Sequence, residues 1–189
     1  MKLLIASNNQ HKIDEIKQIL GGKFEQIMSL NEAGIDCDPE ENGTTFAENA
    51  LIKAEAVAKL TNMAVLADDT GLCVDELGGA PGVHSARYAG DHDNAKNRAK
   101  LLAELDGKSN RNAHFETAVA LLYPDGKLVT ATGRVDGKIL RAEAGQGGFG
   151  YDSLFFCDEL GKSFAEATPQ EKNAHSHRGR ALANLLAKL

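Results

Sequence analysis

Apolar positions along the chain follow two periods, one typical of strands and one typical of helices, and the two alternate. Continuous apolar runs predict strands at residues 3–6, 24–30 and 63–67. Apolar residues spaced three and four apart predict helices that begin after residue 12, at residue 45 and near residue 93. The first half of the chain therefore predicts strand–helix crossovers.

The second half of the chain adds a hairpin to this pattern. Strand-like residues 115–123 and 127–135 flank Pro124-Asp125-Gly126, which is a hairpin turn sequence. A short strand is predicted at residues 154–157, and a final helix has its apolar face between residues 181 and 189. Crossovers together with a hairpin predict an α/β fold with a mixed β-sheet flanked by helices, which we expect residues 1–189 to form as a single domain.

Composition and charge narrow the classes of function. A hydrophobic content of 42% and a charged content of 25% are typical of a soluble globular protein. The net charge of −6 argues against a nucleic-acid partner recognised through a basic surface. The apolar residues 1–6 are too short for a signal peptide, and no apolar run approaches the roughly 18 residues that span a membrane. We therefore expect a cytoplasmic protein with no membrane partner, and its three cysteines, which form no CxxC pair, are expected to be reduced.

Asp68 and Asp69 stand in the middle of an otherwise apolar segment. The predicted strand at 63–67 precedes them, and a second extended piece at 72–74 follows. Because adjacent side chains on an extended chain point to opposite sides, one aspartate can face a cleft while the other anchors a turn. A plain Asp-Thr-Gly turn explains the same residues. The role of Asp68 stays open between an outer metal ligand and a supporting carboxylate.

Two loops carry groups that suit a ligand. Residues 7–12 join the first strand to the first helix, where backbone N–H groups and Lys12 suit an anion, although simple helix capping is an alternative. Residues 145–150 match GxGxxG, but they lead into a predicted strand and not a helix, which excludes a dinucleotide-binding turn. This glycine loop would present Phe149, Tyr151 and Asp152 to a planar ring, or form a structural turn with Phe149 buried.

Charged side chains gather in two further places. The cations near the C-terminus are Lys172, His175, His177, Arg178 and Arg180. Two of them fall in the first turn of the last helix, where cations oppose the helix dipole, and this favours a ligand over plain surface charge. The carboxylates, which suit Mg²⁺ because it prefers oxygen ligands, are Asp38, Glu40, Glu41, Asp68 and Asp69. Together with the two loops, these clusters predict a nucleoside triphosphate bound through Mg²⁺.

Six segments carry a resemblance to a known family. They are Ser-Asn-Asn-Gln-His-Lys at 7–12, Thr-Phe-Ala-Glu-Asn-Ala at 45–50, Ala-Asp-Asp-Thr-Gly-Leu at 67–72, Gly-Gly-Ala-Pro-Gly-Val-His-Ser-Ala-Arg-Tyr at 78–88, Gly-Gly-Phe-Gly-Tyr-Asp at 147–152 and Ser-His-Arg-Gly at 176–179. In this order they resemble the noncanonical purine nucleoside triphosphate pyrophosphatases, which act on inosine and xanthosine triphosphates. Ser153 departs from the family pattern, which has proline after the Tyr-Asp pair.

The resemblance implies hydrolysis of ITP, dITP and XTP to the monophosphate and pyrophosphate with Mg²⁺. It also implies a homodimer whose elongated mixed sheet has two lobes and a central substrate cleft. Glu41 and Asp69 would bind the metal, and Asp69 would be catalytic by positioning or deprotonating the attacking water. The residues that would contact substrate are Ser7, Asn8, Asn9, Gln10, His11, Lys12, Lys53, Thr70, Phe149, Gly150, Tyr151, Asp152, Lys172, His177 and Arg178.

Physical arguments add expectations to these roles. A carboxyl beside Mg²⁺ keeps a low pKa, so Asp69 is expected to orient water more than to act as a strong base. Lys172, Arg178 and backbone N–H groups are candidate donors to a 6-keto oxygen, and such donors would reject a 6-amino group. Two alternatives remain, a pyrophosphatase for other modified nucleotides and a non-catalytic nucleotide-binding module. Pyrophosphate release separates the enzyme from the binding module.

Overall fold

The computed structural model describes all 189 residues and confirms the alternation of strands and helices. The strands are β1 (Lys2–Ile5), β2 (Gln26–Ser29), β3 (Ala64–Val74), β4 (Asn112–Leu122), β5 (Leu128–Ile139), β6 (Phe155–Cys157) and β7 (Lys162–Ser163). The α-helices are α1 (Gln10–Leu20), α2 (Phe46–Ala58), α3 (Asn94–Glu104), α4 (Pro169–His175) and α5 (His177–Leu186). Two 3₁₀ helices, η1 (Asp75–Leu77) and η2 (Gly82–Arg87), lie between β3 and α3. No helix is both long enough and apolar enough to cross a membrane.

The strands form one mixed sheet, as the sequence predicts. Its order is β2-β1-β3-β4-β5-β6-β7. β1 runs parallel to both β2 and β3, whereas β6 is antiparallel to β5 and β7. The predicted turn between β4 and β5 is present, since the backbone N–H of Tyr123 donates to the carbonyl of Lys127 at 2.9 Å. Crossovers and a hairpin thus coexist in one sheet.

The prediction of a turn at Asp68-Asp69-Thr70-Gly71 is wrong. These residues lie inside β3, which continues for 11 residues without a break. Gly71 does not have a positive φ, so its backbone does not adopt the left-handed conformation of a turn. The extended conformation has a physical reason, because it sends the two carboxylates to opposite faces of the strand, where each meets buried polar partners.

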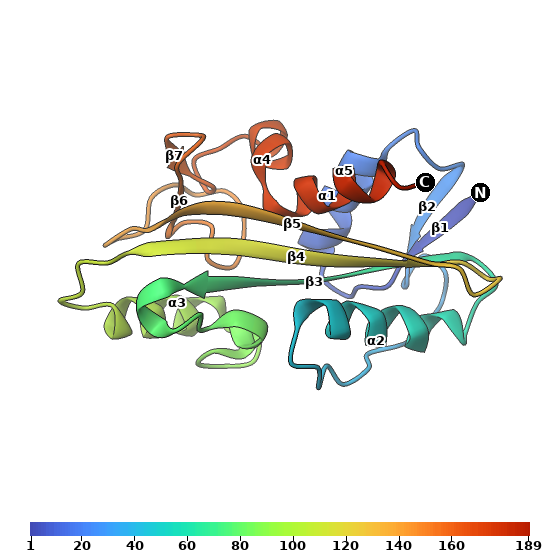
Figure 1. Ribbon diagram of the computed structural model, residues 1–189, viewed down its shortest axis with the longest axis horizontal. Helices are drawn as coiled ribbons and strands as arrows, with labels where there is room; N and C mark the ends of the chain where they lie inside the picture. The colour runs from blue at the N-terminus through green and yellow to red at the C-terminus, as the bar shows by residue number, and fades with distance from the viewer. The chain divides into compact units, whose positions relative to one another are not determined.

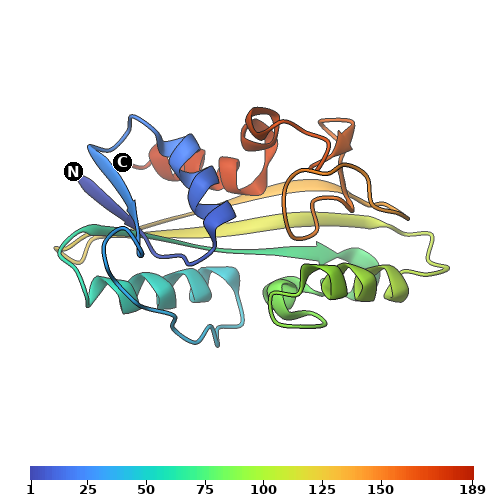
Figure 2. The same ribbon diagram turned by 180° about the vertical axis from the view of Figure 1, so that it is seen from behind.

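The chain divides into two compact units. Unit 1 consists of Met1–Asp69, Thr117–Gly133 and Arg178–Leu189. In unit 1, α1 and α5 lie on one face of the strands and α2 lies on the other (Figures 1 and 2). The side chains of Leu3, Ile5 and Leu66 alternate toward the first face, where they join one apolar cluster with Ile16 of α1 and Leu182 of α5.

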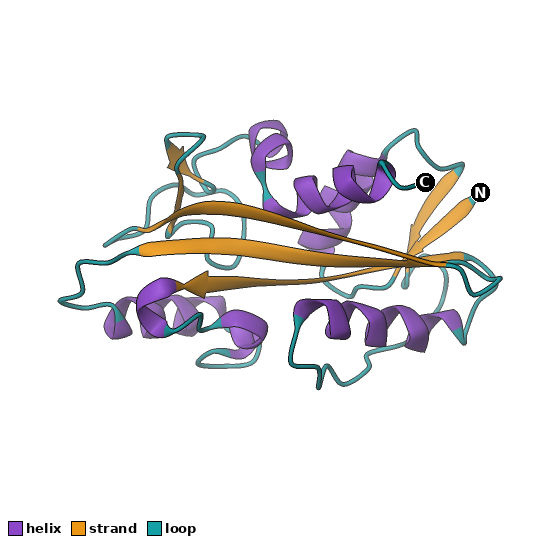
Figure 3. Cartoon of the chain, viewed as in Figure 1, coloured by secondary structure: helices purple, strands orange, loops and turns teal.

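Unit 2 consists of Thr70–Glu116 and Arg134–His177. Much of its chain between β5 and α4 is loop, with only β6 and β7 as short strands (Figure 3). Its core contains packed aromatic rings among aliphatic side chains. The ring of Phe155 lies 4.7 Å from that of Phe115 and 5.1 Å from that of Phe164, measured between centroids. This packing gives the loops a fixed support despite their lack of regular structure.

Candidate active site

Asp68 and Asp69 are the buried acidic residues of β3, exposed by 1% and 7%. Asp68 faces α1 and α5, because its partners are Lys12 and Arg178. Asp69 faces α2, because its partners there are Asn49 and Lys53. Two adjacent residues thus place one carboxylate on each face of the sheet within unit 1.

Asp68 is enclosed by cations. Its Oδ2 lies 3.2 Å from Lys12 Nζ and accepts hydrogen bonds from Nε and Nη2 of Arg178, each also at 3.2 Å. Arg178 is itself only 1% exposed, and its Nη1 donates to Glu15 of α1. Burial favours the neutral acid, but Lys12 and Arg178 outweigh it and hold the pKa of Asp68 well below its usual range. Asp68 is therefore an anion that compensates buried cations.

Asp69 has a different environment. Its Oδ2 accepts a hydrogen bond from Asn49 Nδ2 at 3.0 Å, and its Oδ1 lies 3.8 Å from Lys53 Nζ. The same ammonium group lies 2.9 Å from Oε2 of Glu41. Burial raises the pKa of Asp69 despite the nearby lysines, whereas a low pKa is expected beside a bound metal. In the protein alone, burial is the stronger effect.

Asn49 holds this arrangement together, a role that the sequence pattern does not predict for it. Its Oδ1 accepts the backbone N–H of Gly43 at 2.8 Å while its Nδ2 donates to Asp69. A side chain at position 43 would collide, since a Cβ there would lie 2.6 Å from Asn49 Oδ1. Asn49 thus connects Asp69 to the loop that carries Glu41. The available signal was a polar residue on the apolar face of α2, between Phe46 and Ala50.

The loop at residues 7–12 performs the capping that was its alternative interpretation. Asn9 is the N-cap of α1, and its side chain accepts the backbone N–H of Lys12 at 3.3 Å. The backbone N–H of Asn9 in turn donates to Ser7 Oγ at 3.1 Å, and Asn8 Nδ2 donates to the carbonyl of Cys37. Gln10 and His11 are exposed at the start of the helix. Contact between this loop and an anion stays a prediction.

Unit 2 brings together three other predicted residues. Lys172 Nζ lies 2.6 Å from Oδ2 of Asp152, and both side chains are almost fully buried. The ammonium group also lies 4.5 Å from the ring centroid of Phe149, which is a cation–π contact. The backbone N–H of Phe149 donates to Asp152 at 3.0 Å. The half-buried ring of Phe149 therefore forms one group with a buried cation and a buried carboxylate next to the glycine loop.

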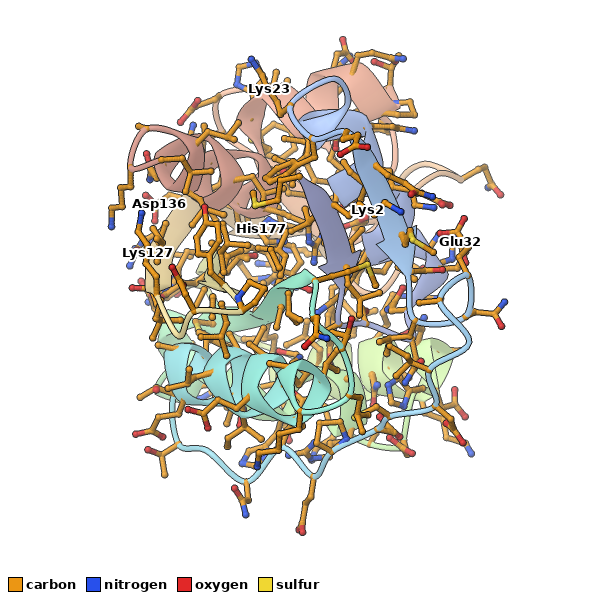
Figure 4. The ribbon with its side chains drawn as sticks, turned by 90° about the vertical axis from the view of Figure 1, so that its right-hand side faces the viewer. Lys2, Lys23, Glu32, Lys127, Asp136 and His177 are labelled. Carbon is orange, nitrogen blue, oxygen red and sulfur yellow. The ribbon has the colours of Figure 1, made fainter.

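Two further side chains of unit 2 are buried in its core. Tyr151, which the sequence predicts at the substrate ring, is 6% exposed, and its hydroxyl donates to the carbonyl of Ser85 at 2.6 Å. Contact between Tyr151 and substrate stays a prediction. His177, labelled in Figure 4, is 3% exposed and stacks on Phe115 at 4.5 Å. Ser85 Oγ also accepts the backbone N–H of Leu72, a role that the family-like segment at 78–88 did not indicate. Ser85 thus ties Tyr151 to β3.

Other predicted residues lie beside these groups. Gly150 has a positive φ, and its carbonyl accepts a hydrogen bond from Arg98 Nη1 at 2.9 Å. Arg98 Nε lies 2.7 Å from Glu143, which also accepts the hydroxyl of Ser153. The serine that replaces the family proline is therefore held by a hydrogen bond. Thr70 is half-buried and directly follows Asp69 in β3.

The donor set around Asp69 suits a hard divalent cation. No group of three or more His, Cys, Asp and Glu side chains could hold a metal by itself. Glu41 and Asp69 nevertheless direct carboxylate oxygens at one cationic centre, the Lys53 ammonium. Divalent cations in enzymes of nucleoside triphosphates are usually bound through one or two carboxylates, with the remaining positions taken by water and substrate phosphates. A carboxylate pair is therefore a sufficient protein contribution.

A mixed-sheet α/β protein with a buried acid and lysine cluster is the class that the fold and these groups define. The chain belongs to the Ham1 family, whose model matches residues 3–188. It is 50% identical to a dITP/XTP pyrophosphatase of Clostridium perfringens, with 97% of this chain and 95% of that protein covered. It is 46% identical to one of Bacillus subtilis, with 96% and 93% covered. The Ham1 protein structure of Staphylococcus aureus matches with a TM-score of 0.88 at 39% identity, covering 100% of this chain and 97% of that one.

Proposed function

We propose that this protein hydrolyses noncanonical purine nucleoside triphosphates, namely ITP, dITP and XTP, to the monophosphate and pyrophosphate. The observation that carries the proposal is the buried carboxylate of Asp69, which shares one cationic centre with Glu41. The dITP/XTP pyrophosphatases of C. perfringens and B. subtilis support the same substrate class. The reaction would remove these nucleotides from the precursor pool.

The residues of unit 1 would act on the phosphates. Glu41 and Asp69 would hold Mg²⁺, which when bound supplies positive charge to the α–β phosphoanhydride and to the attacking water. Lys12 and Lys53 would neutralise the charge that develops as that bond breaks. Asp69 would orient the attacking water and accept its proton, a role supported by its position beside Glu41 and Lys53 at the proposed metal site. Asn49 would keep this carboxylate in position.

The group formed by Phe149, Asp152 and Lys172 in unit 2 would select the base. The ring of Phe149 offers a face for stacking, and Lys172 and backbone N–H groups offer donors to a 6-keto oxygen. A 6-amino group is itself a hydrogen-bond donor and could not accept from these donors. Each buried group left without a partner would weaken binding by roughly 1–3 kcal/mol. Arg178 is a weaker candidate for this task than the sequence suggests, because its hydrogen bonds go to Asp68 and Glu15. We further infer a cytoplasmic homodimer without nucleic-acid or membrane partners.

A substrate panel tests the proposal. Pyrophosphate release is measured with dITP, ITP, XTP, ATP and GTP at equal concentrations, and Asp69→Asn serves as the control for contaminating activity. We expect kcat/KM for the first three nucleotides to exceed that for ATP by at least about tenfold, the ratio that corresponds to one unpaired group. GTP shares the 6-keto oxygen, so its value measures the effect of the 2-amino group alone. Comparable values for ATP would refute the substrate class. Retention of ITP without pyrophosphate release would identify a binding module instead.

A further inference from the structure

The position of Lys53 has a consequence beyond phosphate binding. Its Nζ lies 2.9 Å from Glu41 Oε2 and 3.8 Å from Asp69 Oδ1, so it stands between the two carboxylates proposed to bind the metal. The side chain is only 13% exposed. Burial lowers the pKa of Lys53, but Asp68, Asp69 and Glu41 outweigh burial and raise it, so the amine stays charged.

We propose that the Lys53 ammonium is a built-in substitute for the divalent cation, which the metal must displace before it can bind. This inference rests on the proposed function, since it concerns the same carboxylate pair. Mg²⁺ takes oxygen ligands at about 2.0–2.1 Å. An ammonium group cannot remain between the same oxygens, because the two cations repel each other strongly at that separation. Lysine has a flexible four-carbon stem, so its head can move to another anion.

The charges of the cluster show why displacement is coupled to the nucleotide. The charged network in unit 1 contains four carboxylates, Glu15, Glu41, Asp68 and Asp69, and three cations, Lys12, Lys53 and Arg178. Lys12 and Arg178 are held by Asp68 on the other face of β3. Lys53, displaced alone, would lose its anions in a buried place, which is costly. A triphosphate supplies the new anion, so metal and nucleotide are expected to bind together and not the metal first.

The fixed partners of the carboxylates support this exchange. Asn49 holds Oδ2 of Asp69 and the N–H of Gly43, so the acid and the loop keep their places when Lys53 leaves. Oδ1 of Asp69 is the oxygen that faces Lys53. The site is thus organised by Asn49 and neutralised by Lys53. Only the neutralising partner has to change.

Mn²⁺ binding to the full chain without nucleotide tests the proposal, measured by calorimetry and by the electron paramagnetic resonance signal of the free ion. Lys53→Met removes the competing ammonium at nearly constant side-chain length and should bind Mn²⁺ about tenfold or more tightly than the wild type. Lys12→Met is the matched control, because it removes one charge from the same cluster but from Asp68. We expect a much smaller gain from it. Lys53→Gln provides a second variant with a polar head.

The outcomes separate this proposal from the proposed function. Unchanged Mn²⁺ affinity in both Lys53 variants, or an equal gain in Lys12→Met, would overturn the proposal that the Lys53 ammonium takes the place of the divalent cation. A gain that persists when Glu41→Gln is added to Lys53→Met would also overturn it, since the metal would then bind elsewhere. If the wild type fails to release pyrophosphate from dITP while Lys53→Met gains Mn²⁺ affinity, the proposed function is wrong. The proposal that Lys53 takes the place of the divalent cation is then still supported.

Discussion

Asp68 and Asp69 are neighbours in the chain, yet their carboxylates meet partners from opposite faces of β3. Asp68 lies 3.2 Å from Lys12 Nζ on the side of α1, and Asp69 accepts a hydrogen bond from Asn49 of α2 at 3.0 Å. Burial raises the pKa of Asp69, whereas cations lower that of Asp68. The same residue type therefore serves as a structural counter-ion in one position and as a candidate for chemistry in the next.

Asp69→Asn should abolish most activity and leave the protein folded. The amide keeps the shape of the side chain and can still accept from Asn49, but it cannot take a proton or bind a metal as an anion. We expect kcat for dITP to fall about 10²–10⁴-fold. The free energy of unfolding in urea should be equal to or above that of the wild type, because burial disfavours the charged form. Near-normal turnover would remove Asp69 from the mechanism.

Asp68→Asn should give the opposite result for stability. Arg178 and Lys12 would remain buried without their shared anion, which destabilises a protein by about 3–5 kcal/mol. The free energy of unfolding in urea measures the loss. Adding Arg178→Met should restore part of it, since the uncompensated guanidinium is removed. A loss below about 1 kcal/mol would mean that Asp68 is not the counter-ion that its contacts indicate.

Chelation should separate activity from stability. EDTA is expected to stop pyrophosphate release, and added Mg²⁺ should restore it, because the metal bound by the carboxylate pair would supply positive charge to the phosphates. The melting temperature of the nucleotide-free protein should not change with EDTA, since the Lys53 ammonium already pairs with Glu41 and Asp69. Activity that persists in the chelator would contradict the metal role. A lower melting temperature would contradict the neutralising role of Lys53.

Tyr151→Phe tests whether Tyr151 is structural. Its buried hydroxyl donates to Ser85, and its loss leaves that carbonyl without this donor, so the free energy of unfolding should fall by about 1–2 kcal/mol. kcat/KM for dITP should remain close to the wild-type value, because the ring lies in the apolar core. Phe149→Leu is the comparison, as that ring contacts Lys172 and its loss should lower kcat/KM. Unchanged stability with reduced kcat/KM in Tyr151→Phe would show that the Tyr151 hydroxyl contacts the substrate and is not structural.

Local sequence patterns predicted the helices and strands. The features that these patterns did not predict depend on partners that are distant in the chain. The capping box of Thr45 and Glu48 predicts the start of α2 because all its atoms lie within one turn. The turn at Asp68-Asp69 was a wrong prediction because the partners that favour extended backbone there come from α1, α2 and α5. Tyr151 has its hydrogen-bond partner 66 residues away in the chain. Sequence spacing alone does not reveal such pairs.

The candidate site divides in the same way. Lys12, Lys53 and Arg178 were identified from charge pattern and family resemblance, and the structure places all three around the β3 carboxylates. Asn49 was missed because its only local signal is a polar residue on the apolar face of α2, which does not show that its partner is Asp69. Glu15 was missed because its importance depends on Arg178, which is 163 residues away. Both act by holding another side chain, so they become visible only with the fold.

Glu32 provides a test of the electrostatics away from the site. It lies at the outside of unit 1 with Lys2 and Lys23 (Figure 4). Lys17 Nζ lies 2.8 and 2.7 Å from its two carboxylate oxygens, and the N–H of Ser29 donates at 2.7 Å. These hydrogen bonds lower the pKa of Glu32 to about 2. Since the folded pKa lies below the unfolded value of about 4.3, the resulting stability is present above that value and is lost as the pH falls toward 2.

Lys17→Met should therefore raise the pKa of Glu32 toward its ordinary value, because the largest cause of the shift is the Lys17 hydrogen bond. Carboxyl chemical shifts followed by NMR between about pH 2 and pH 7 would measure it directly, since that window spans both the lowered and the ordinary value. Glu48 is the internal control, because its lowered pKa comes from hydrogen bonds with Thr44 and should be the same in both proteins. If Glu32 titrates identically with and without Lys17, Ser29 alone must hold the carboxylate, and the ion pair contributes nothing measurable.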